Sequence, residues 1–367
     1  MKKTNKKTAF LAATMIAVML LGGCGKKDEE TTAAVTEEAA INVSPVATME
    51  GSAEDIQVIS KEGYILSDLT GEWIEDKYEN QRPFCIMVNN ISEAMPQAGL
   101  SQAAITYEIL VEGGITRFLC VFDKYDDIEK LGPIRSARVP YVQLSKMYDG
   151  FFAHYGWSPT AQEMIESDSE VLSLNGLSLG ETMYYRDPGR SAPHDVFTNS
   201  DLIAAGIESK GYSLEHDDSY VPMFSFNYKD KPLVKGDPKP GNQVITAYSD
   251  TRVPRFVYDE NDGLYHRLQF YDPQIDANTG EGLAYKNVLI LMVEYTSDET
   301  GYYRFVSWDK DMLFYYFTDG QYIVGNCRYE DGVNKLYYPD ETELKLNPGQ
   351  TFVTVFDYTM PASIIIE

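Results

Sequence analysis

The stretch ITYEILVEGGITRFLCVFD, at residues 105–123, constrains the fold more than any other part of the sequence. Two short apolar runs, rich in β-branched and aromatic residues, flank the pair Gly113-Gly114. Runs of this length and composition are typical of strands, and a glycine pair between them is typical of a tight hairpin turn. We therefore expect two neighbouring antiparallel strands.

The same stretch carries charged residues close to its turn. If the two glycines are the central turn residues, Glu112 faces Ile115 across the hairpin. Side chains alternate between the two faces of a strand, so Glu108, Glu112 and Arg117 would then share one face. The pattern fits either a salt bridge on a solvated face or a functional cluster, and this segment taken alone favours the salt bridge.

The rest of the first half alternates between strand and helix patterns. Short apolar runs predict strands, and apolar residues spaced three or four apart predict helices. The predicted strands lie at residues 83–90 and 151–157, and the predicted helices at 136–148, 161–166 and 200–210. Asn199 or Ser200 is expected to cap the last helix. This alternation, which continues to about residue 215, predicts an α/β-type layered domain.

The second half lacks this alternation. Its short aromatic and β-branched runs are separated by turn signals such as DENDG at residues 259–263, a pattern typical of antiparallel sheets. The predicted fold class is therefore α+β. An N-terminal α/β-type domain at residues 59–228 is followed by an antiparallel β-rich C-terminal domain at residues 229–367. Together they are long enough for two cores.

The N-terminus carries the marks of export. Four lysines precede an apolar run at residues 9–21, which is short for a membrane span and typical of a signal peptide. The run ends in LGGC, which resembles the lipobox of bacterial lipoproteins. We expect a signal peptide at residues 1–23, a lipid such as palmitate on Cys24, and a disordered acidic tether at residues 24–58.

Charge and composition exclude several classes of function. The chain has 31 Lys+Arg against 56 Asp+Glu, a net charge of −25, which argues against nucleic acid as a partner because phosphate backbones need a basic surface. Cys85, Cys120 and His154 lie in apolar runs and are expected in the core. The four histidines lack zinc-ligand spacing, and no nucleotide-binding or nucleophile motif occurs. We therefore expect no metal, no cofactor and no covalent catalysis.

A pair of arginines lies at the start of the helix predicted at residues 136–148. In GPIRSAR, Arg135 and Arg138 are three residues apart and can lie on one side of a helix capped by Ser136. Helix N-termini and arginine side chains both bind carboxylate or phosphate groups. The motif is a candidate anion site. The alternative is that both arginines neutralise nearby carboxylates.

A second group of candidate residues lies in the loop YRDPGRSAPHD. Loops that carry charged residues are often functional, and this one holds Arg186, Arg190 and His194. His194 can act as a general acid or base near neutral pH. Asn89 and Asn90, at the end of a predicted strand, stand where α/β sheets often place ligand contacts.

Five motifs follow one another along residues 60–365: RPFCIMVNN, MPQAGLSQAAITYEILVEGGITRFLCVF, LGPIRSARVPYV, RDPGRSAPHDVF and LKLNPGQTFVTVF. Together they resemble the YerB-like bacterial lipoproteins, a family defined by domains of unknown function. The resemblance implies a lipid anchor and two domains, but no reaction. It carries over the polar positions Asn89, Glu108, Glu112, Arg117, Arg135, Arg138, Arg186, Arg190 and His194. Cys85 stands where the family usually has an aliphatic residue, which fits a core role.

Three functions stay open. The first is an extracytoplasmic lipoprotein, anchored to the cell membrane through Cys24, that binds an anionic envelope ligand such as a phosphate- or carboxylate-bearing glycan. The second is a hydrolase of such material that uses His194 with Glu108 or Glu112. These glutamates are roughly 13 Å apart along a strand, too far for a glycosidase pair. The third is a scaffold for envelope proteins, with no particular partner indicated. The predicted ligand-binding residues are Asn89, Asn90, Glu112, Arg117, Arg135, Arg138, Arg186 and Arg190.

Overall fold

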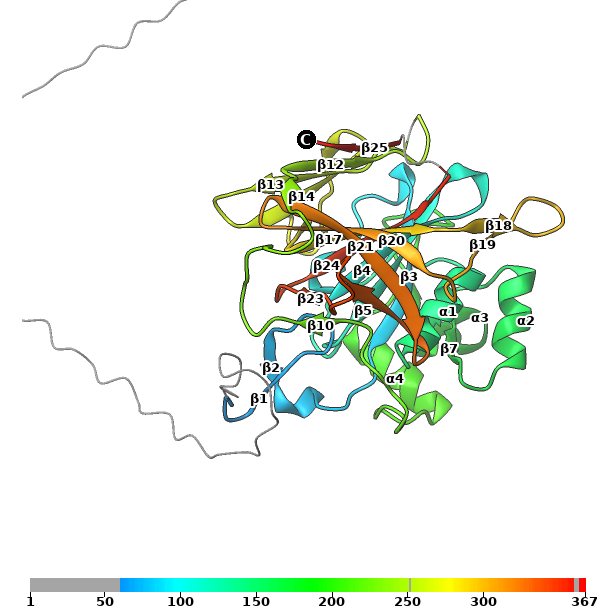
Figure 1. The fold of residues 1–367 in the computed structure, drawn as a ribbon. Coiled ribbons are helices and arrows are strands. Elements are labelled where there is room, and N and C mark those ends of the chain that lie inside the picture. Colours follow the sequence, from blue (N-terminus) through cyan, green and yellow to red (C-terminus); the bar gives the residue numbers. More distant parts are fainter. Residues whose placement is uncertain (1–59, 251, 360–362) are drawn as a thin grey trace, which may run out of the picture. The chain divides into compact units, whose positions relative to one another are not determined.

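Strands from both halves of the chain form one mixed sheet (Figure 1). The computed structural model describes residues 60–250, 252–359 and 363–367, and within them this sheet has eleven strands. The predicted signal peptide, Cys24 and the tether lie outside these residues. The order is β11 (Lys239–Pro240), β21 (Gln321–Glu330), β20 (Met312–Thr318), β17 (Asn287–Val293), β24 (Thr351–Asp357), β4 (Ile105–Leu110), β5 (Thr116–Phe122), β3 (Phe84–Asn90), β6 (Phe151–His154) and β7 (Leu172–Asn175), with β22 (Val333–Tyr337) paired to β21.

The pairing of β24 corrects the prediction of a purely antiparallel second half. β24 runs parallel to β17 on one side and to β4 on the other. Its sequence TFVTVFD is buried at every position but the last, so it reads as a continuous apolar run. Central parallel strands have this pattern because both of their faces are covered. The long segment between β17 and β24 provides the crossover that parallel pairing requires.

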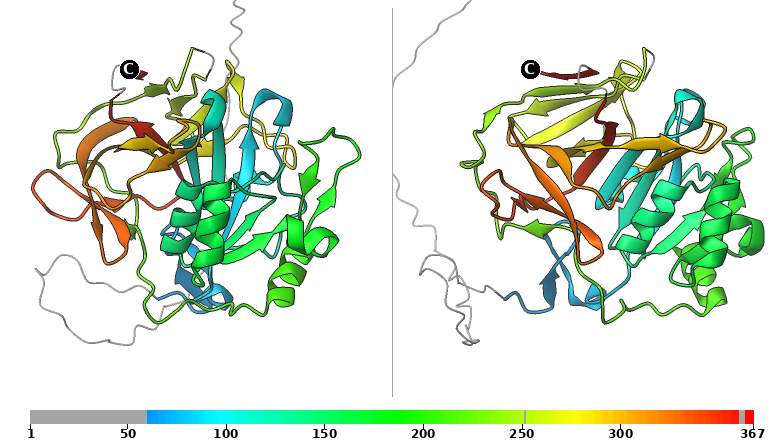
Figure 2. Two further views of the ribbon diagram at one scale, coloured as in Figure 1. Left: turned by 90° about the vertical axis from the view of Figure 1, so that its right-hand side faces the viewer. Right: turned by 45° about the vertical axis from the view of Figure 1, so that its right-hand side comes forward.

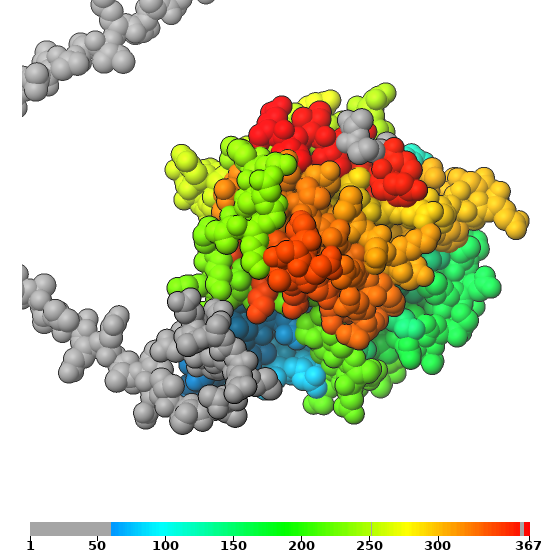
Figure 3. Space-filling view, in the orientation of Figure 1, coloured from blue at the N-terminus to red at the C-terminus, as the bar shows by residue number. Residues whose placement is uncertain are grey.

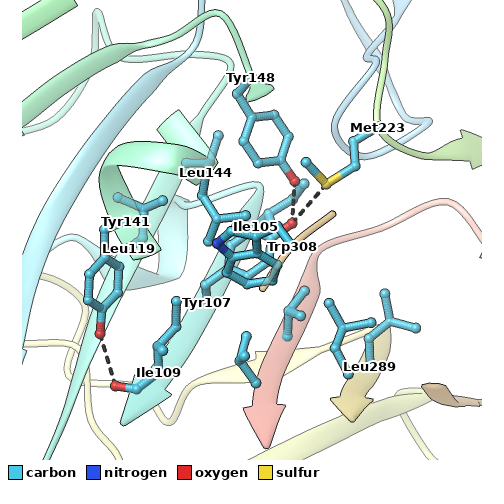
Figure 4. Close-up of a cluster of buried hydrophobic side chains, with 14 of the residues drawn as sticks. Ile105, Tyr107, Ile109, Leu119, Tyr141, Leu144, Tyr148, Met223, Leu289 and Trp308 are labelled. Atoms are coloured by element: carbon cyan, nitrogen blue, oxygen red, sulfur yellow. Dashed lines mark hydrogen bonds between the residues drawn. The ribbon is translucent and has the colours of Figure 1, made fainter. Parts of the chain in front are cut away.

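The sheet crosses the domain boundary that was predicted near residue 229. β24 from the second half pairs with β4 from the first, and Ser60–Glu367 form one unit. Each face of the sheet has an apolar core built from both halves. One core contains Tyr107 and Leu289 (Figure 4). The other contains Phe118 and Phe352, whose rings meet edge to face at 5.9 Å.

A second, six-stranded sheet covers the core of Phe118 among the described residues, since Phe256 and Tyr265 belong to that same core. Its order is β15 (Asp272–Pro273), β14 (Leu264–Gln269), β13 (Arg255–Asp259), β12 (Gln243–Thr246) and β25 (Ile364–Ile366), with β16 (Ala284–Tyr285) beside β14. The hairpin of β13 and β14 confirms the DENDG turn. The small strand pairs are β1 (Tyr64–Leu66) with β2 (Trp73–Glu75), β8 (Tyr185–Arg186) with β9 (Val196–Phe197), β10 (Ser225–Phe226) with β23 (Lys345–Leu346), and β18 (Tyr295–Ser297) with β19 (Arg304–Val306).

Within the described residues, the α-helices come from the first half. They are α1 (Val139–Met147), α2 (Pro159–Ser167), α3 (Gly176–Leu179) and α4 (Ser200–Lys210). Figure 2 shows α1 and α2 side by side on one face of the main sheet. Helix α4 has the predicted bounds, and the side chain of Asn199 caps it by accepting from the backbone N–H of Leu202 at 3.0 Å. Figure 3 shows the second half of the chain, coloured from yellow-green to red, over most of the upper surface in this view.

Helix α1 begins three residues later than predicted. Arg138 is its N-cap residue with extended backbone angles, and Pro140 lies in its first turn, where proline fits without loss of a hydrogen bond. Ser136 is therefore not the cap, and its hydroxyl donates to the carbonyl of Tyr155 at 2.9 Å. Arg135 and Arg138 both precede the helix, in an extended segment.

The hairpin of β4 and β5 has a different register from the predicted one. Its turn is the three-residue segment η4 (Glu112–Gly114), and Leu110 pairs with Thr116. The predicted two-residue turn would have paired Leu110 with Arg117. A shift of one residue moves side chains to the opposite face. Glu108 therefore lies opposite Phe118, and the prediction that Glu108 and Arg117 share a face is wrong.

The predictions for the core cysteines and for His154 are confirmed. Cys85 and Cys120 are fully buried and free, and so is Cys327. His154 is also fully buried, with its Nδ1 2.8 Å from the carbonyl of Gly156 and its Nε2 2.8 Å from the hydroxyl of Ser173. No helix among the described residues is long and apolar enough to cross a membrane.

Candidate functional site

The turn between β4 and β5 holds a carboxylate between two arginines. Nε of Arg138 donates to Glu112 at 2.8 Å and its Nη2 donates to the second oxygen of the same carboxylate, so the contact is bidentate. Arg117 Nη2 adds a contact at 3.3 Å. The three side chains are only 4–12% exposed. Burial opposes ionisation of Glu112, but the hydrogen bond from Arg138 and the charge of Arg117 outweigh it and lower the pKa of Glu112.

The two arginines are themselves held by the segment that leads into α1. Arg117 Nη1 donates to the carbonyl of Ser136 at 2.5 Å, and Arg138 Nη1 donates to the carbonyl of Ala137 at 2.8 Å. Burial, followed by the charge of Arg138, lowers the pKa of Arg117 to about 10. Arg117 therefore stays protonated at neutral pH. Its burial makes its charge costly unless an anion is near.

Arg135 joins this group without a carboxylate of its own. Its Nη1 donates to the carbonyl of Pro193 at 3.1 Å, and no ion pair to it occurs within residues 60–250, 252–359 and 363–367. Burial and then the charge of Arg138 lower its pKa. Arg135, Arg138 and Arg117 thus place three positive charges around the single negative charge of Glu112.

His194 lies near Arg135, which donates a hydrogen bond to the carbonyl of the preceding residue, Pro193. The side-chain amide of Asn89, at the end of β3, donates to Nδ1 of His194 at 2.8 Å. Burial lowers the pKa of His194, and the charges of Arg135 and Arg190 lower it further, against Glu93. The ring is therefore neutral at pH 7 and carries its proton on Nε2.

The two arginines of the loop differ in their partners. Arg190 donates to the carbonyls of Ala94 and Pro96, lies over the ring of Phe197, and makes no ion pair with any described carboxylate. Arg186 is exposed and donates to both oxygens of Asp195, at 2.8 and 2.9 Å. Arg190 thus adds a positive charge near His194 that no described carboxylate contacts, although it acts on Asp187 through space, whereas Arg186 is neutralised by Asp195.

We define the arginine site as Asn89, Glu112, Arg117, Arg135, Arg138, Arg190 and His194. The structure brings these predicted residues together from β3, the β4–β5 turn, β5, the segment before α1 and the loop between β8 and β9. Tyr303, between β18 and β19, borders the site with its ring 5.7 Å from the Arg138 guanidinium.

Two other predicted residues, Asn90 and Glu108, belong to a buried network instead. Glu108 is fully buried and accepts hydrogen bonds from Asn90 at 2.9 Å and from Thr116 at 2.7 Å. Its second oxygen accepts from Arg267 of β14 at 2.9 Å, in an ion pair with almost no exposure. Arg267 was not among the residues predicted for the site. The signal was its inward position between Tyr265 and Gln269 in the alternating strand LYHRLQ.

One group of metal-type ligands occurs among the described residues, away from the arginine site. Asp259, Asp262 and His266, at the DENDG turn, place ligand atoms within 4.8 Å of one another. Nε2 of His266 lies 2.8 Å from Asp262, and both carboxylates are exposed. Local turn contacts already use one oxygen of each: Asp259 accepts from the backbone of Asn261 and Asp262 from that of Leu264.

Comparison with known proteins decides the family. The model described as Protein of unknown function (DUF3048) N-terminal domain matches residues 69–213, and the model of the C-terminal domain matches residues 244–353. The chain belongs to the DUF3048 family. This confirms the resemblance seen in the motifs. Strands from both matched segments of DUF3048 lie in the main sheet, as two blocks that meet where β24 pairs with β4.

Two further comparisons, one with a sequence and one with a solved structure, both concern YerB of Bacillus subtilis. "Putative lipoprotein YerB" of Bacillus subtilis (strain 168) is 35% identical over 231 residues, which is 61% of this chain and 66% of the relative, slightly less than two thirds of its length. The crystal structure of YerB from Bacillus subtilis is similar with a TM-score of 0.73 at 29% identity, over 83% of this chain and 99% of that one. Similarity to a lipoprotein agrees with attachment to a membrane.

Proposed function

We propose that this protein is a lipoprotein, anchored through Cys24 on the extracytoplasmic face of the cell membrane, that binds an anionic envelope ligand at the arginine site. The observation that carries the proposal is the pair Arg135 and Arg190. Neither has a carboxylate partner among the described residues, although the chain has 25 more acidic than basic side chains. Where acidic groups are abundant, partly buried arginines without one are available for a ligand.

The ligand class follows from the donors in the arginine site. Guanidinium groups bind carboxylate and phosphate oxygens in a planar, bidentate geometry. His194, neutral at pH 7, offers Nε2–H as a further donor, since Asn89 occupies its Nδ1. A site made of donors fits a phosphate- or carboxylate-bearing glycan.

The geometry supports binding more than hydrolysis. A general acid or base must reach the reacting group, but Glu108 is fully buried and holds Arg267, Asn90 and Thr116. Glu112 is likewise occupied, by Arg117 and Arg138. Both glutamates that the hydrolase hypothesis pairs with His194 are thus already engaged by other side chains.

The test is titration of the purified chain with inorganic phosphate, glycerol phosphate and glucuronate by calorimetry at low salt. We expect the double variant Arg135→Ala/Arg190→Ala to bind at least tenfold more weakly, because each charge-assisted contact contributes about 1.5–3 kcal/mol. Arg186→Ala is the matched control and should leave affinity unchanged, since Asp195 neutralises Arg186. Equal affinities in all three proteins would refute the proposal.

The anchor has a separate test. Cys24→Ala should move the protein from the membrane fraction to the soluble fraction, because a lipidated cysteine supplies the hydrophobic attachment. An unchanged membrane fraction would refute this part of the proposal and leave the arginine site untouched.

A further inference from the structure

The contact between Glu112 and Arg138 shows which chemical group the arginine site accepts. Nε and Nη2 of Arg138 hold the two oxygens of one carboxylate, and Nη2 of Arg117 reaches one of the same oxygens. This is the fork geometry by which arginine recognises a carboxylate or a phosphate. The Glu112 carboxylate thus already occupies part of the arginine site, and it is the same kind of group as the proposed ligand carries.

The carboxylate and its arginines are supported very differently. Glu112 lies in the three-residue turn, where Gly113 and Gly114 have φ of 71° and 68°. Both glycines are exposed, and a Cβ built on either would have no neighbour within 4 Å. The arginines instead donate to backbone carbonyls at Ser136 and Ala137. Glu112 is therefore carried by an exposed turn with open space around its glycines, whereas Arg117 and Arg138 are held in place by hydrogen bonds to the backbone.

The charge balance favours an exchange of anions. With Glu112 in place, three arginines surround one carboxylate. Without it, three partly or fully buried positive charges would face one another, which is unfavourable unless another anion enters. A phosphate or carboxylate that reaches Arg138 can replace Glu112 at little electrostatic cost, because the charge of Arg135 acts on the same region.

We infer that Glu112 occupies the position of the ligand on Arg138 and Arg117 when no ligand is bound. The ligand presents a carboxylate or phosphate group that displaces Glu112 from these two guanidinium groups. This inference rests on the proposed function. It makes Glu112 an autoinhibitory contact that lowers the apparent affinity, because only the fraction of molecules with the turn open binds ligand. A ligand with a single acceptor atom cannot replace both contacts to Arg138.

The experiment compares phosphate binding by the wild-type chain, Glu112→Gln and Glu93→Gln. Glutamine keeps the size of the side chain but loses the ion pair, so Glu112→Gln should bind inorganic phosphate at least tenfold more tightly. Glu93 is the matched control: it is an exposed glutamate close enough to His194 to affect its pKa, and it touches no arginine of the fork. Glu93→Gln removes the same charge without freeing a fork and should change affinity less than threefold.

The outcomes separate the two proposals. Two results would overturn the inference and leave the proposed function intact. One is an equal gain in phosphate affinity in Glu112→Gln and Glu93→Gln. The other is no gain in phosphate affinity in Glu112→Gln while the wild type binds phosphate through Arg135 and Arg190. Failure of every variant to bind phosphate, glycerol phosphate or glucuronate would overturn the proposed function itself.

A measurement on the wild type covers the case in which Glu112→Gln does not fold. The Glu112 carboxylate can be titrated by ¹³C NMR with and without saturating phosphate. Release from the arginines should raise its pKa toward the ordinary value of about 4.3. A pKa that stays low in the presence of bound phosphate would show that Glu112 keeps its arginines, and would overturn the inference.

Discussion

At the scale of single residues, the most consequential contact is the ion pair of Glu108 and Arg267. It joins β4 to β14 with side chains that are 1% and 0% exposed, and the guanidinium lies 4.7–5.4 Å from the rings of Phe118, Phe256 and Phe352. A buried pair contributes little beyond what well-packed apolar residues would contribute, but loss of one partner leaves the other charge buried without compensation. The pair therefore matters chiefly as a constraint on which strands pack together.

We expect Arg267→Met to lower the free energy of unfolding by about 3–5 kcal/mol, because Glu108 would lose its counter-charge in the core. The double variant Glu108→Gln/Arg267→Met should cost less than the sum of the single changes. Urea unfolding measures both, with Arg186→Met as the surface control, which should change stability by less than about 1 kcal/mol. Additive costs would contradict the coupling.

His154 gives a prediction about pH. Burial lowers its pKa to about 4, whereas the unfolded chain titrates near 6.5. Between these values the unfolded state binds more protons than the folded state, so stability falls as pH falls. We expect this residue to remove about 3 kcal/mol between pH 7 and pH 4. Urea unfolding at both pH values should show a weaker pH dependence in His154→Asn, and an identical dependence would count against this account.

At the scale of elements, the β4–β5 hairpin shows how a turn sets the surface around it. Glycines at positions 113 and 114 fit either a two-residue or a three-residue turn, and the two turns differ by one residue in register. The three-residue turn leaves Glu112 outside the strands, where it meets Arg138, and turns Glu108 into the core. The glycine pair alone does not choose between these turns. The packing of both strands in the central sheet does.

The turn itself can be tested by substitution. Gly113→Ala should cost about 1–2 kcal/mol, because a side chain at φ 71° is strained even though the space around it is open. Gly282→Ala is the control, since its φ is not in the left-handed region and the added Cβ meets only Pro273 at 3.9 Å. It should have almost no effect. Equal stabilities of the two variants in urea unfolding would show that the turn adapts.

At the scale of the whole molecule, the two segments of the family share one sheet and two cores. β24 of the second segment lies between β17 and β4. β4 is the last strand of the first segment's part of the sheet, and without β24 one of its edges would be unpaired. An unpaired central strand and an uncovered core are unfavourable in water. The two segments therefore depend on each other for folding.

We expect residues 60–228, expressed alone, to lack a cooperative unfolding transition. β4 would lose β24, and Glu108 would lose Arg267. Near-UV circular dichroism and thermal unfolding provide the measurement, with residues 60–367 as the control that should unfold cooperatively. A sharp transition of the short fragment, with dispersed amide resonances, would show that the first segment folds independently.

The sequence by itself indicated most of the local elements and the family, and it named all seven residues of the arginine site. Hydrophobic periodicity and turn residues are local signals, and they located the hairpins, α4, the core cysteines and His154. Tertiary structure decided the register of β4 and β5, the parallel position of β24, the partner of Glu108, and which arginines are left without a carboxylate. These depend on contacts between residues far apart in the chain, such as Glu108 and Arg267. A local pattern can show that a strand or side chain is buried, but it does not name the distant partner that buries it.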